Sequence, residues 1–321
     1  MAQAPKVFPQ IEAALKRLDD LAQRKPELAE TVTFYRAVIP VLYQARQAVP
    51  AFTLDPDRAQ QKLKMGQPLL VGEDLPLDGS ATMALFLRLC QIIENTAVSP
   101  TPRATGWSLF KRGRPDAVQV MAQAVEGNGI ALRATATRQI RQAVEQNQLD
   151  LAHIWGAIAM GDEISLAHAA AQLQLDASLL FVLVQNSLKP ALQTWAQGVN
   201  QIVNLAYWRH GYCPMCGNAP ALAEIKGKEG ARHLRCTLCA ASWSYPRLQC
   251  PFCNSRDHKV LGYLAVEDEE EKYRLQTCDA CRNYLKVVVT YDPIPIDQLI
   301  VEDLATLHLD LVANERDFVR L

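Results

Sequence analysis

The chain has 321 residues, of which 49% are hydrophobic and 21% are charged, a balance typical of globular rather than disordered proteins. Its 33 lysines and arginines nearly equal its 34 aspartates and glutamates, so no overall basic excess favours a nucleic-acid partner. The sequence has no signal-peptide pattern, and no run approaches the roughly 18 apolar residues that a membrane span needs. We therefore expect a cytoplasmic protein without stable membrane insertion.

Before about residue 200, apolar residues recur at the spacing of amphipathic helices. The first stripe consists of Ile11, Leu15, Leu18 and Leu21. Residues 64–80 interrupt the pattern with glycine and proline and predict a long loop, and Gly-Asn-Gly at 127–129 predicts the end of a helix. Besides a second stripe after Pro26, helices are expected at about 80–97, 115–126, 131–147, 150–160, 164–174 and 177–209.

From about Gly211 the sequence changes to short segments rich in aromatic and β-branched residues, with turns between several of them. Strands are expected at 221–225, 232–236, 242–249, 260–266, 273–277 and 284–291. Pro293 and Pro295 end this region. Residues 297–321 return to a helical pattern, in which we expect Leu299, Leu304, Leu307, Leu311 and Phe318 to pack back on one of the domains.

Eight of the nine cysteines form four Cys-x-x-Cys pairs, separated by 19, 10 and 24 residues. Two such pairs, each in a tight turn or knuckle, close a tetrahedral four-sulfur metal site. Gaps of 19 and 24 residues each accommodate a hairpin, so we expect sequential grouping, with an interleaved cross-brace as the alternative. The candidate ligands are Cys213, Cys216, Cys236 and Cys239 in the first centre and Cys250, Cys253, Cys278 and Cys281 in the second.

The residues around the pairs also suit metal knuckles. Pro214 fixes φ inside the first turn, and Gly217 tolerates the positive φ that often follows the second ligand. Asn254 can serve in the same way, whereas Arg282 is less expected after the fourth pair. A structural metal contributes on the order of 10 kcal/mol, which is decisive for a small β module.

The ligand set limits the chemistry. Four thiolates suit zinc or a single rubredoxin-type iron, and nothing in the ligand list separates these two metals. Because the protein supplies all four ligands, no position remains for an activated water, which disfavours a hydrolytic enzyme. Thioredoxin-like chemistry needs one reactive pair near a helix N-terminus, and here four pairs lie among strands. We therefore expect two metal ions per chain and no catalytic residues.

Together these patterns predict an α + small β fold. The expected domains are an all-helical domain over 1–208, a first rubredoxin-like or zinc-ribbon module over 209–248, a second over 249–296, and a C-terminal helix over 297–321. The oligomeric state is not predicted.

Three stretches carry a more specific pattern than Cys-x-x-Cys alone. They are GYCPMCGNAP at 211–220, ARHLRCTLCAASWSYPRLQCPFC at 231–253 and TCDACRNYLKVV at 277–288. These stretches resemble the formate dehydrogenase accessory, or FdhE-type formation, protein family, as does the Pro-Leu-Leu at 68–70 more weakly. Arg282 departs from the family pattern, where glycine is expected.

The resemblance implies an assembly factor rather than an enzyme. Members of this family are cytoplasmic proteins needed for active respiratory formate dehydrogenases. The resemblance further implies binding to the catalytic subunit of formate dehydrogenase before its export by the twin-arginine route, and cysteine centres like those of rubredoxin.

Two other hypotheses remain open from the residues. A rubredoxin-like electron carrier fits the ligand chemistry. A zinc-ribbon protein that binds nucleic acid is less favoured, because residues 211–291 contain 11 basic and 9 acidic side chains and hence no strongly basic face.

The remaining candidates have simpler interpretations. Cys90 is expected in a helix as a small core residue. The six histidines have no ligand spacing among themselves, and His233, although near Cys236, is not needed by a complete centre. The acidic run at 267–271 is expected to be a solvated loop. Trp243 and Arg247 are expected beside the metal centres, with a partner surface as the alternative.

Overall fold

The computed structural model describes residues 8–72, 75–96, 128–159, 162, 164–227, 230–266, 269 and 271–320. The chain divides into two units. The first draws its described residues from Met1–Pro50, Pro76–Leu109 and Ala117–Ala191, and the second from Ala51–Leu75 and Leu192–Leu321. Among the described residues, no helix is both long enough and apolar enough to cross a membrane.

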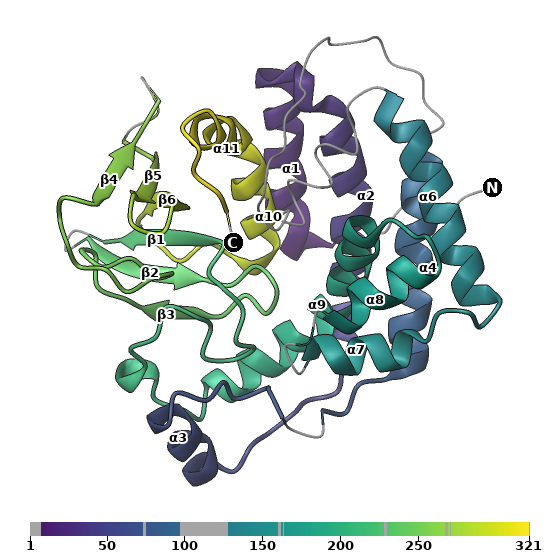
Figure 1. Ribbon diagram of the computed structural model, residues 1–321, viewed down its shortest axis with the longest axis horizontal. Coiled ribbons are helices and arrows are strands. Elements are labelled where there is room, and N and C mark those ends of the chain that lie inside the picture. The colour runs from purple at the N-terminus through teal and green to yellow at the C-terminus, as the bar shows by residue number, and fades with distance from the viewer. Residues whose placement is uncertain are drawn as a thin grey trace. The chain divides into compact units, whose positions relative to one another are not determined.

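The first unit is helical (Figure 1). Its helices are α1 (Pro9–Arg24), α2 (Ala29–Gln47), α4 (Gly79–Thr96), α6 (Asn128–Glu145), α7 (Leu151–Ala159), α8 (Ile164–Gln172) and the first part of α9 (Ala177–Asn200). The stripe predicted along α1 is buried, and α1 packs on α2, α2 on α4 and α4 on α6. Arg141 of α6 donates to Glu94 of α4 at 2.9 Å, which links the last two helices.

Cys90 lies in α4 with none of its surface exposed, as predicted for a core residue. Burial raises the pKa of its thiol to about 12. Because the thiolate is the reactive form of cysteine, this side chain is inert at neutral pH.

Some helix boundaries differ from the prediction. The helix α6 begins at Asn128, so Gly129 lies in its first turn rather than in a break. The helix α9 ends at Asn200, where the chain tightens into i to i−3 hydrogen bonds, and a separate 3-10 turn, η2, follows at Leu205–Tyr207. The sequence pattern missed α3 (Pro56–Lys64), which begins after Asp55 accepts a hydrogen bond from the Arg58 N–H. The helix predicted at 115–126 lies outside the described residues.

The second unit contains one six-stranded sheet with strand order β3-β2-β1-β6-β5-β4. Its strands are β1 (Leu222–Lys226), β2 (Ala231–Arg235), β3 (Ser242–Ser244), β4 (Leu261–Leu264), β5 (Tyr273–Cys278) and β6 (Asn283–Thr290). Strands β1 to β3 form one antiparallel meander and β4 to β6 another. The meanders join through a parallel pairing of β1 with β6, in which Leu222 lies opposite Lys286. The two cysteine modules therefore share one continuous sheet.

Two helices follow the sheet where the sequence predicted one. They are α10 (Ile296–Ala305) and α11 (Leu307–Asn314). The Thr306 hydroxyl donates to the carbonyls of Glu302 and Asp303, which competes with the helical backbone and accounts for the break. The break resets the helical register, so Leu309 packs against the sheet in α11 whereas Leu307 is only half-buried.

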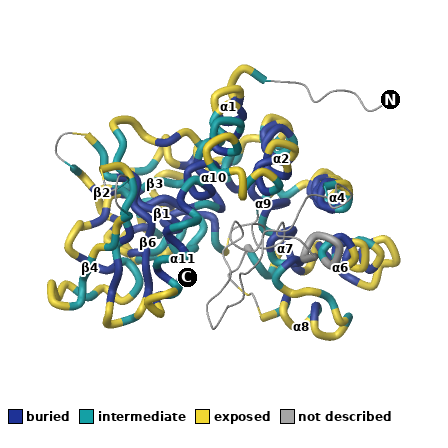
Figure 2. The backbone as a smooth tube through the Cα atoms, turned by 90° about the horizontal axis from the view of Figure 1, so that it is seen from above, coloured by how far each residue is buried: buried dark blue, intermediate teal, exposed yellow. Residues whose placement is uncertain are grey.

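The core of the second unit lies between the sheet and these two helices. Strands β1 and β6 are largely buried (Figure 2). One cluster joins Leu222 and Val288 of the sheet to Leu299 of α10, and another joins Tyr284 to Leu309 and Phe318. The helical first part, the small sheet with two four-cysteine modules and the C-terminal helices confirm the predicted fold class; the domain boundaries at 208, 248 and 296 stay a prediction.

Candidate metal centres

The structure brings the eight paired cysteines into two groups of four. The first contains Cys213, Cys216, Cys236 and Cys239, and the second contains Cys250, Cys253, Cys278 and Cys281. Within each group, all four sulfur atoms lie within 4.8 Å of one another. This is the sequential grouping rather than the cross-brace. That the eight residues bind metal stays a prediction. The geometry of each group can be compared with what a metal ion requires.

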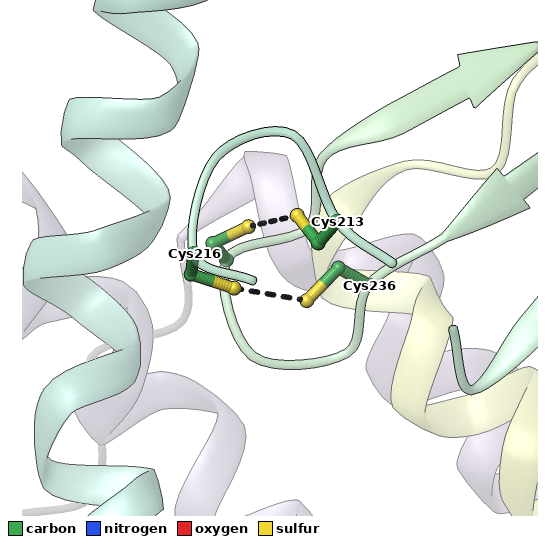
Figure 3. A group of neighbouring side chains, drawn as sticks. Cys213, Cys216 and Cys236 are labelled. Atoms are coloured by element: carbon green, nitrogen blue, oxygen red, sulfur yellow. Dashed lines mark hydrogen bonds between the residues drawn. The ribbon is translucent and has the colours of Figure 1, made fainter. Parts of the chain in front are cut away.

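The sulfur spacing suits a four-coordinate metal. In the first group, Sγ of Cys213 lies 3.4 Å from that of Cys239, and Sγ of Cys216 lies 3.5 Å from that of Cys236 (Figure 3). The corresponding distances in the second group are 3.7 Å and 3.6 Å. Four sulfurs placed tetrahedrally at about 2.3 Å from a zinc ion lie about 3.8 Å apart. A disulfide needs about 2.05 Å, so both groups fit a metal ion and not a pair of disulfides.

All four Cys-x-x-Cys turns have the same backbone form. The residue after the second cysteine has a positive φ in every turn: 79° at Gly217, 60° at Ala240, 61° at Asn254 and 58° at Arg282. In three of the turns, the N–H of this residue donates to the carbonyl of the first cysteine at 2.8 to 3.0 Å. The Met215 N–H also approaches Sγ of Cys213 at 3.4 Å, as expected for a knuckle that stabilises thiolate charge.

Arg282 adopts the knuckle conformation although it is not glycine. Its side chain compensates for the backbone cost through several contacts. It donates to Asp279 at 2.8 Å and to the Arg316 carbonyl, and it lies over the Phe318 ring at 4.1 Å from the centroid. Its departure from the family pattern therefore leaves the fourth knuckle intact and connects it to the C-terminal segment.

Three thiols of the first centre have shifted pKa values, namely those of Cys213, Cys236 and Cys239. Burial raises the pKa of Cys213 and of Cys239, whereas hydrogen bonds with the neighbouring sulfurs lower the pKa of Cys236. Burial thus disfavours the thiolate form of Cys213 and Cys239. A metal ion that binds all four sulfurs must displace the remaining protons, as at other thiolate sites.

The first centre is covered by a distant part of the same unit, which we call the covering segment (residues 65–71). The Leu69 and Leu70 N–H groups donate to the carbonyls of Pro214 and Met215 at 2.9 and 2.8 Å. The Tyr212 hydroxyl donates to the Gly66 carbonyl at 2.7 Å. The covering segment includes the Pro-Leu-Leu motif, and the predicted loop at 64–80 thus holds the first knuckle in place.

The covering segment is itself anchored by α3. Lys62 donates through Nζ to the Val71 carbonyl at 2.9 Å and to the Leu69 carbonyl at 3.3 Å. Leu69 and Leu70 are almost completely buried. A lysine with two backbone acceptors and two buried leucines therefore fix this loop over the centre.

The second centre is supported by Arg232 and Tyr245. Arg232 is buried in β2 and donates to the carbonyls of Pro246 and Gln249 and to the Gln276 side chain. These contacts turn the chain toward Cys250, and with the absent N–H of Pro246 they explain why β3 ends at Ser244 rather than at 249. The Tyr245 hydroxyl donates to the Asn254 side chain at 2.9 Å.

Gly211 brings the two modules into direct contact. A Cβ atom at this position would lie 1.8 Å from the Pro251 carbonyl oxygen, which belongs to the third knuckle. Trp243 also contributes to this junction, because it is buried and donates to the His210 carbonyl at 3.2 Å. Arg247 is exposed. In the part of the chain that is described, no histidine joins either four-sulfur group, as expected for His233.

A buried ion cluster (Lys286, Asp303, Asp310 and Arg320) connects β6 with α10, α11 and the C-terminal segment. Lys286 contacts both aspartates, and Arg320 contacts Asp303 at 2.9 Å. Although burial alone would raise the pKa of Asp303, Arg320 and Lys286 lower it to about 2. The Tyr284 hydroxyl donates to Asp310 at 2.7 Å. Two cations and two anions balance, so the C-terminal helices are held to the sheet without an unpaired buried charge.

This sheet, with its two closed four-sulfur groups, defines a zinc-ribbon-like or rubredoxin-like class of metal-binding protein. Residues 212–247 match the family described as "FdhE, central domain", and residues 248–321 match "FdhE, C-terminal domain". Residues 212–321 are therefore similar in sequence to both FdhE domains, in the same order along the chain.

Individual relatives agree with this similarity. The chain is 34% identical over 150 residues to "Protein FdhE homolog" of Aquifex aeolicus (strain VF5), covering 46% of this chain and 51% of that protein. It is 33% identical over 132 residues to "Protein FdhE" of Escherichia coli O127:H6, covering 39% and 42%. These matches thus span about half of the relatives' length or less.

The fold extends the likeness over the whole chain. The crystal structure of the FdhE protein from Pseudomonas aeruginosa matches with a TM-score of 0.60 at 22% sequence identity, and the match covers 99% of this chain and 95% of that one. The helical first part is therefore also similar in fold, although the two matched family domains begin only at residue 212.

Proposed function

We propose that this protein is an accessory factor for the formation of active formate dehydrogenase, and that it is not itself an enzyme. In this proposal it works in the cytoplasm and binds the catalytic subunit of a respiratory formate dehydrogenase before that subunit is exported. The observation that carries the proposal is the pair of closed four-sulfur groups within the two matched FdhE domains.

The eight cysteines would hold two metal ions, either iron or zinc. A bound metal would supply cross-links that hold the knuckles together and, if it is iron, a one-electron couple. The chain itself holds the sulfurs at tetrahedral spacing through the four knuckles, the covering segment and Arg232. All four positions around each metal would be filled by protein, which supports a role other than hydrolytic catalysis.

The test is complementation combined with co-purification. Cells that lack this protein are expected to lose formate dehydrogenase activity, and the intact chain is expected to restore it and to co-purify with the catalytic subunit. Replacing Cys213 or Cys250 with serine should abolish restoration. Cys90→Ala is the matched control, because Cys90 lies outside both centres. Full formate dehydrogenase activity in cells that lack the protein would refute the proposal.

A rubredoxin-like electron carrier is a second candidate, because Cys253 of the second centre is exposed and a centre near the surface can exchange electrons with a partner. Anaerobically purified protein would then show iron and a visible spectrum that changes reversibly on reduction. Colourless protein with two tightly held zinc ions would exclude this candidate.

A further inference from the structure

The two four-sulfur groups differ in their access to solvent. In the first group, three cysteines are almost fully buried and Cys216 is half-buried. In the second, Cys253 is exposed and Cys281 is half-buried. The neighbouring residues follow the same division. No residue in 211–221 or 236–241 is exposed, whereas Asn254, Asp279 and Ala280 of the second centre are exposed.

The coverings of the two groups explain this difference. The covering segment forms two backbone hydrogen bonds with the turn between Cys213 and Cys216, and Lys62 fixes that segment from behind. In the second group, Tyr245 and Arg232 support the turn through hydrogen bonds to Asn254 and Gln249, and Cys253 remains exposed.

Access decides how a closed four-thiolate site loses its metal. A chelator or another thiol must first take the place of one protein sulfur, and the remaining sulfurs then leave in turn. Because Cys253 is exposed, an incoming ligand can approach the second group at this residue. At the first group, opening of the covering segment would break several hydrogen bonds at once.

We propose that the second centre is an exchangeable metal site and that the first is a permanent one. The second centre takes up or releases a zinc or iron ion through ligand exchange that begins at Cys253. Its exchange partner is a soluble donor or acceptor with nitrogen or thiolate ligands small enough to approach this sulfur. This inference concerns the metal alone and holds or fails independently of any role in formate dehydrogenase formation.

The first experiment follows zinc release from the full chain loaded with two zinc ions. With excess EDTA, release is expected in two phases of one equivalent each. Alkylation by N-ethylmaleimide followed by mass spectrometry assigns the phases. During the fast phase, labels should appear on Cys250, Cys253, Cys278 and Cys281 only. A single phase for both ions, or labelling of the first group before or together with the second, would overturn the proposal.

The second experiment tests the covering segment as the cause. Lys62→Met removes the donor to the Leu69 and Val71 carbonyls while preserving the length of the side chain. The slow phase should then become about tenfold faster, which corresponds to about 1.4 kcal/mol. The fast phase should not change. Lys64→Met, an exposed change at the end of the same helix, is the matched control and should alter neither phase.

The outcomes of this second experiment are distinct. Acceleration of the fast phase alone by Lys62→Met would contradict the proposed cover, as would unchanged kinetics of both phases. Cys253→Ser provides an independent assignment that does not depend on the covering segment. This variant should keep only the slowly released equivalent; if it instead keeps only the rapidly released one, the two centres have been assigned the wrong way round.

Discussion

The contact between Gly211 and the third knuckle offers a sharp test of how the two modules fit together. In Gly211→Ala, the new methyl group would lie 1.8 Å from the Pro251 carbonyl oxygen and 2.6 and 2.8 Å from two further Pro251 backbone atoms. An ordinary contact needs about 3.5 Å, so the two backbones must separate by more than about 1.5 Å. Overpacking costs about 1 to 3 kcal/mol, and we expect the upper end because no side chain can rotate away.

The displacement also affects the second centre, although Gly211 is not a candidate ligand. Pro251 lies between Cys250 and Cys253, and metal sites tolerate changes in ligand distance of only about 0.2 Å. The expected results are a free energy of unfolding lowered by about 3 kcal/mol in urea, followed by tryptophan fluorescence, and a loss of metal from the second centre.

The matched control for this prediction is Gly262→Ala in β4. Its methyl group would meet only the Thr277 hydroxyl at 2.8 Å, and a side chain can rotate away from such a contact. The control should change stability by less than about 1 kcal/mol and should keep both metal ions. If Gly211→Ala is as stable as the control and retains two ions, the close packing of the modules is refuted.

Three further predictions concern other parts of the chain. Lys286→Met should lower the free energy of unfolding in urea by about 3 to 5 kcal/mol, because it leaves Asp303 and Asp310 with only Arg320 as a buried cation; a cost below 1 kcal/mol would contradict the pairing. Because the folded-state pKa of Asp303 is about 2, below its ordinary 3.8, its stabilisation of about 2 kcal/mol is complete above about pH 4 and is lost as the pH falls through 2. Carbon NMR titration should find this carboxylate still ionised at about pH 3, and protonation near pH 4 would refute the pairing. Gln174→Gly should stabilise the chain by roughly 1 kcal/mol in thermal unfolding, since Gln174 is exposed with φ of 53° after α8; a destabilised variant would show that its side chain has a structural role.

The two four-cysteine groups could be predicted because their signal is local and chemically rare. Each turn needs only four or five consecutive residues, and paired thiols at a fixed spacing are typical of metal sites. The lengths between the turns then selected sequential grouping, since a hairpin fits each longer gap. Gly217 and Asn254 carried the positive φ that the sequence suggested. Arg282 showed the limit of that argument, because its compensating contacts come from the distant Arg316 and Phe318.

The cover of the first centre could not be predicted in the same way. Leu69 and Leu70 bond to Pro214 and Met215 through backbone groups alone, and the sequence separation is large. Backbone hydrogen bonds leave no particular side chain as a signal. The Pro-Leu-Leu motif drew attention only through the family resemblance, and its glycine and proline neighbours predicted no more than a loop. The parallel pairing of β1 with β6 was hidden for a similar reason, because the pairing is made by backbone groups and the two strands lie about 60 residues apart in the sequence.

Because the two modules share one continuous sheet, loss of metal from the more exposed second centre need not unfold the sheet. Strand β1 belongs to the first module and β6 to the second, and their pairing extends from Leu222 and Lys286 to Lys226 and Thr290. Lys286 also reaches Asp303, so the same strand connects the first module to the C-terminal helices. A metal ion stabilises the structure that its ligands require. Loss of the ion from the second centre should therefore loosen the turn at Cys253 first, while β6 remains held by β1 and by the buried ion cluster. The sheet can thus remain folded through a cycle of metal exchange, which a pair of independent ribbons could not ensure.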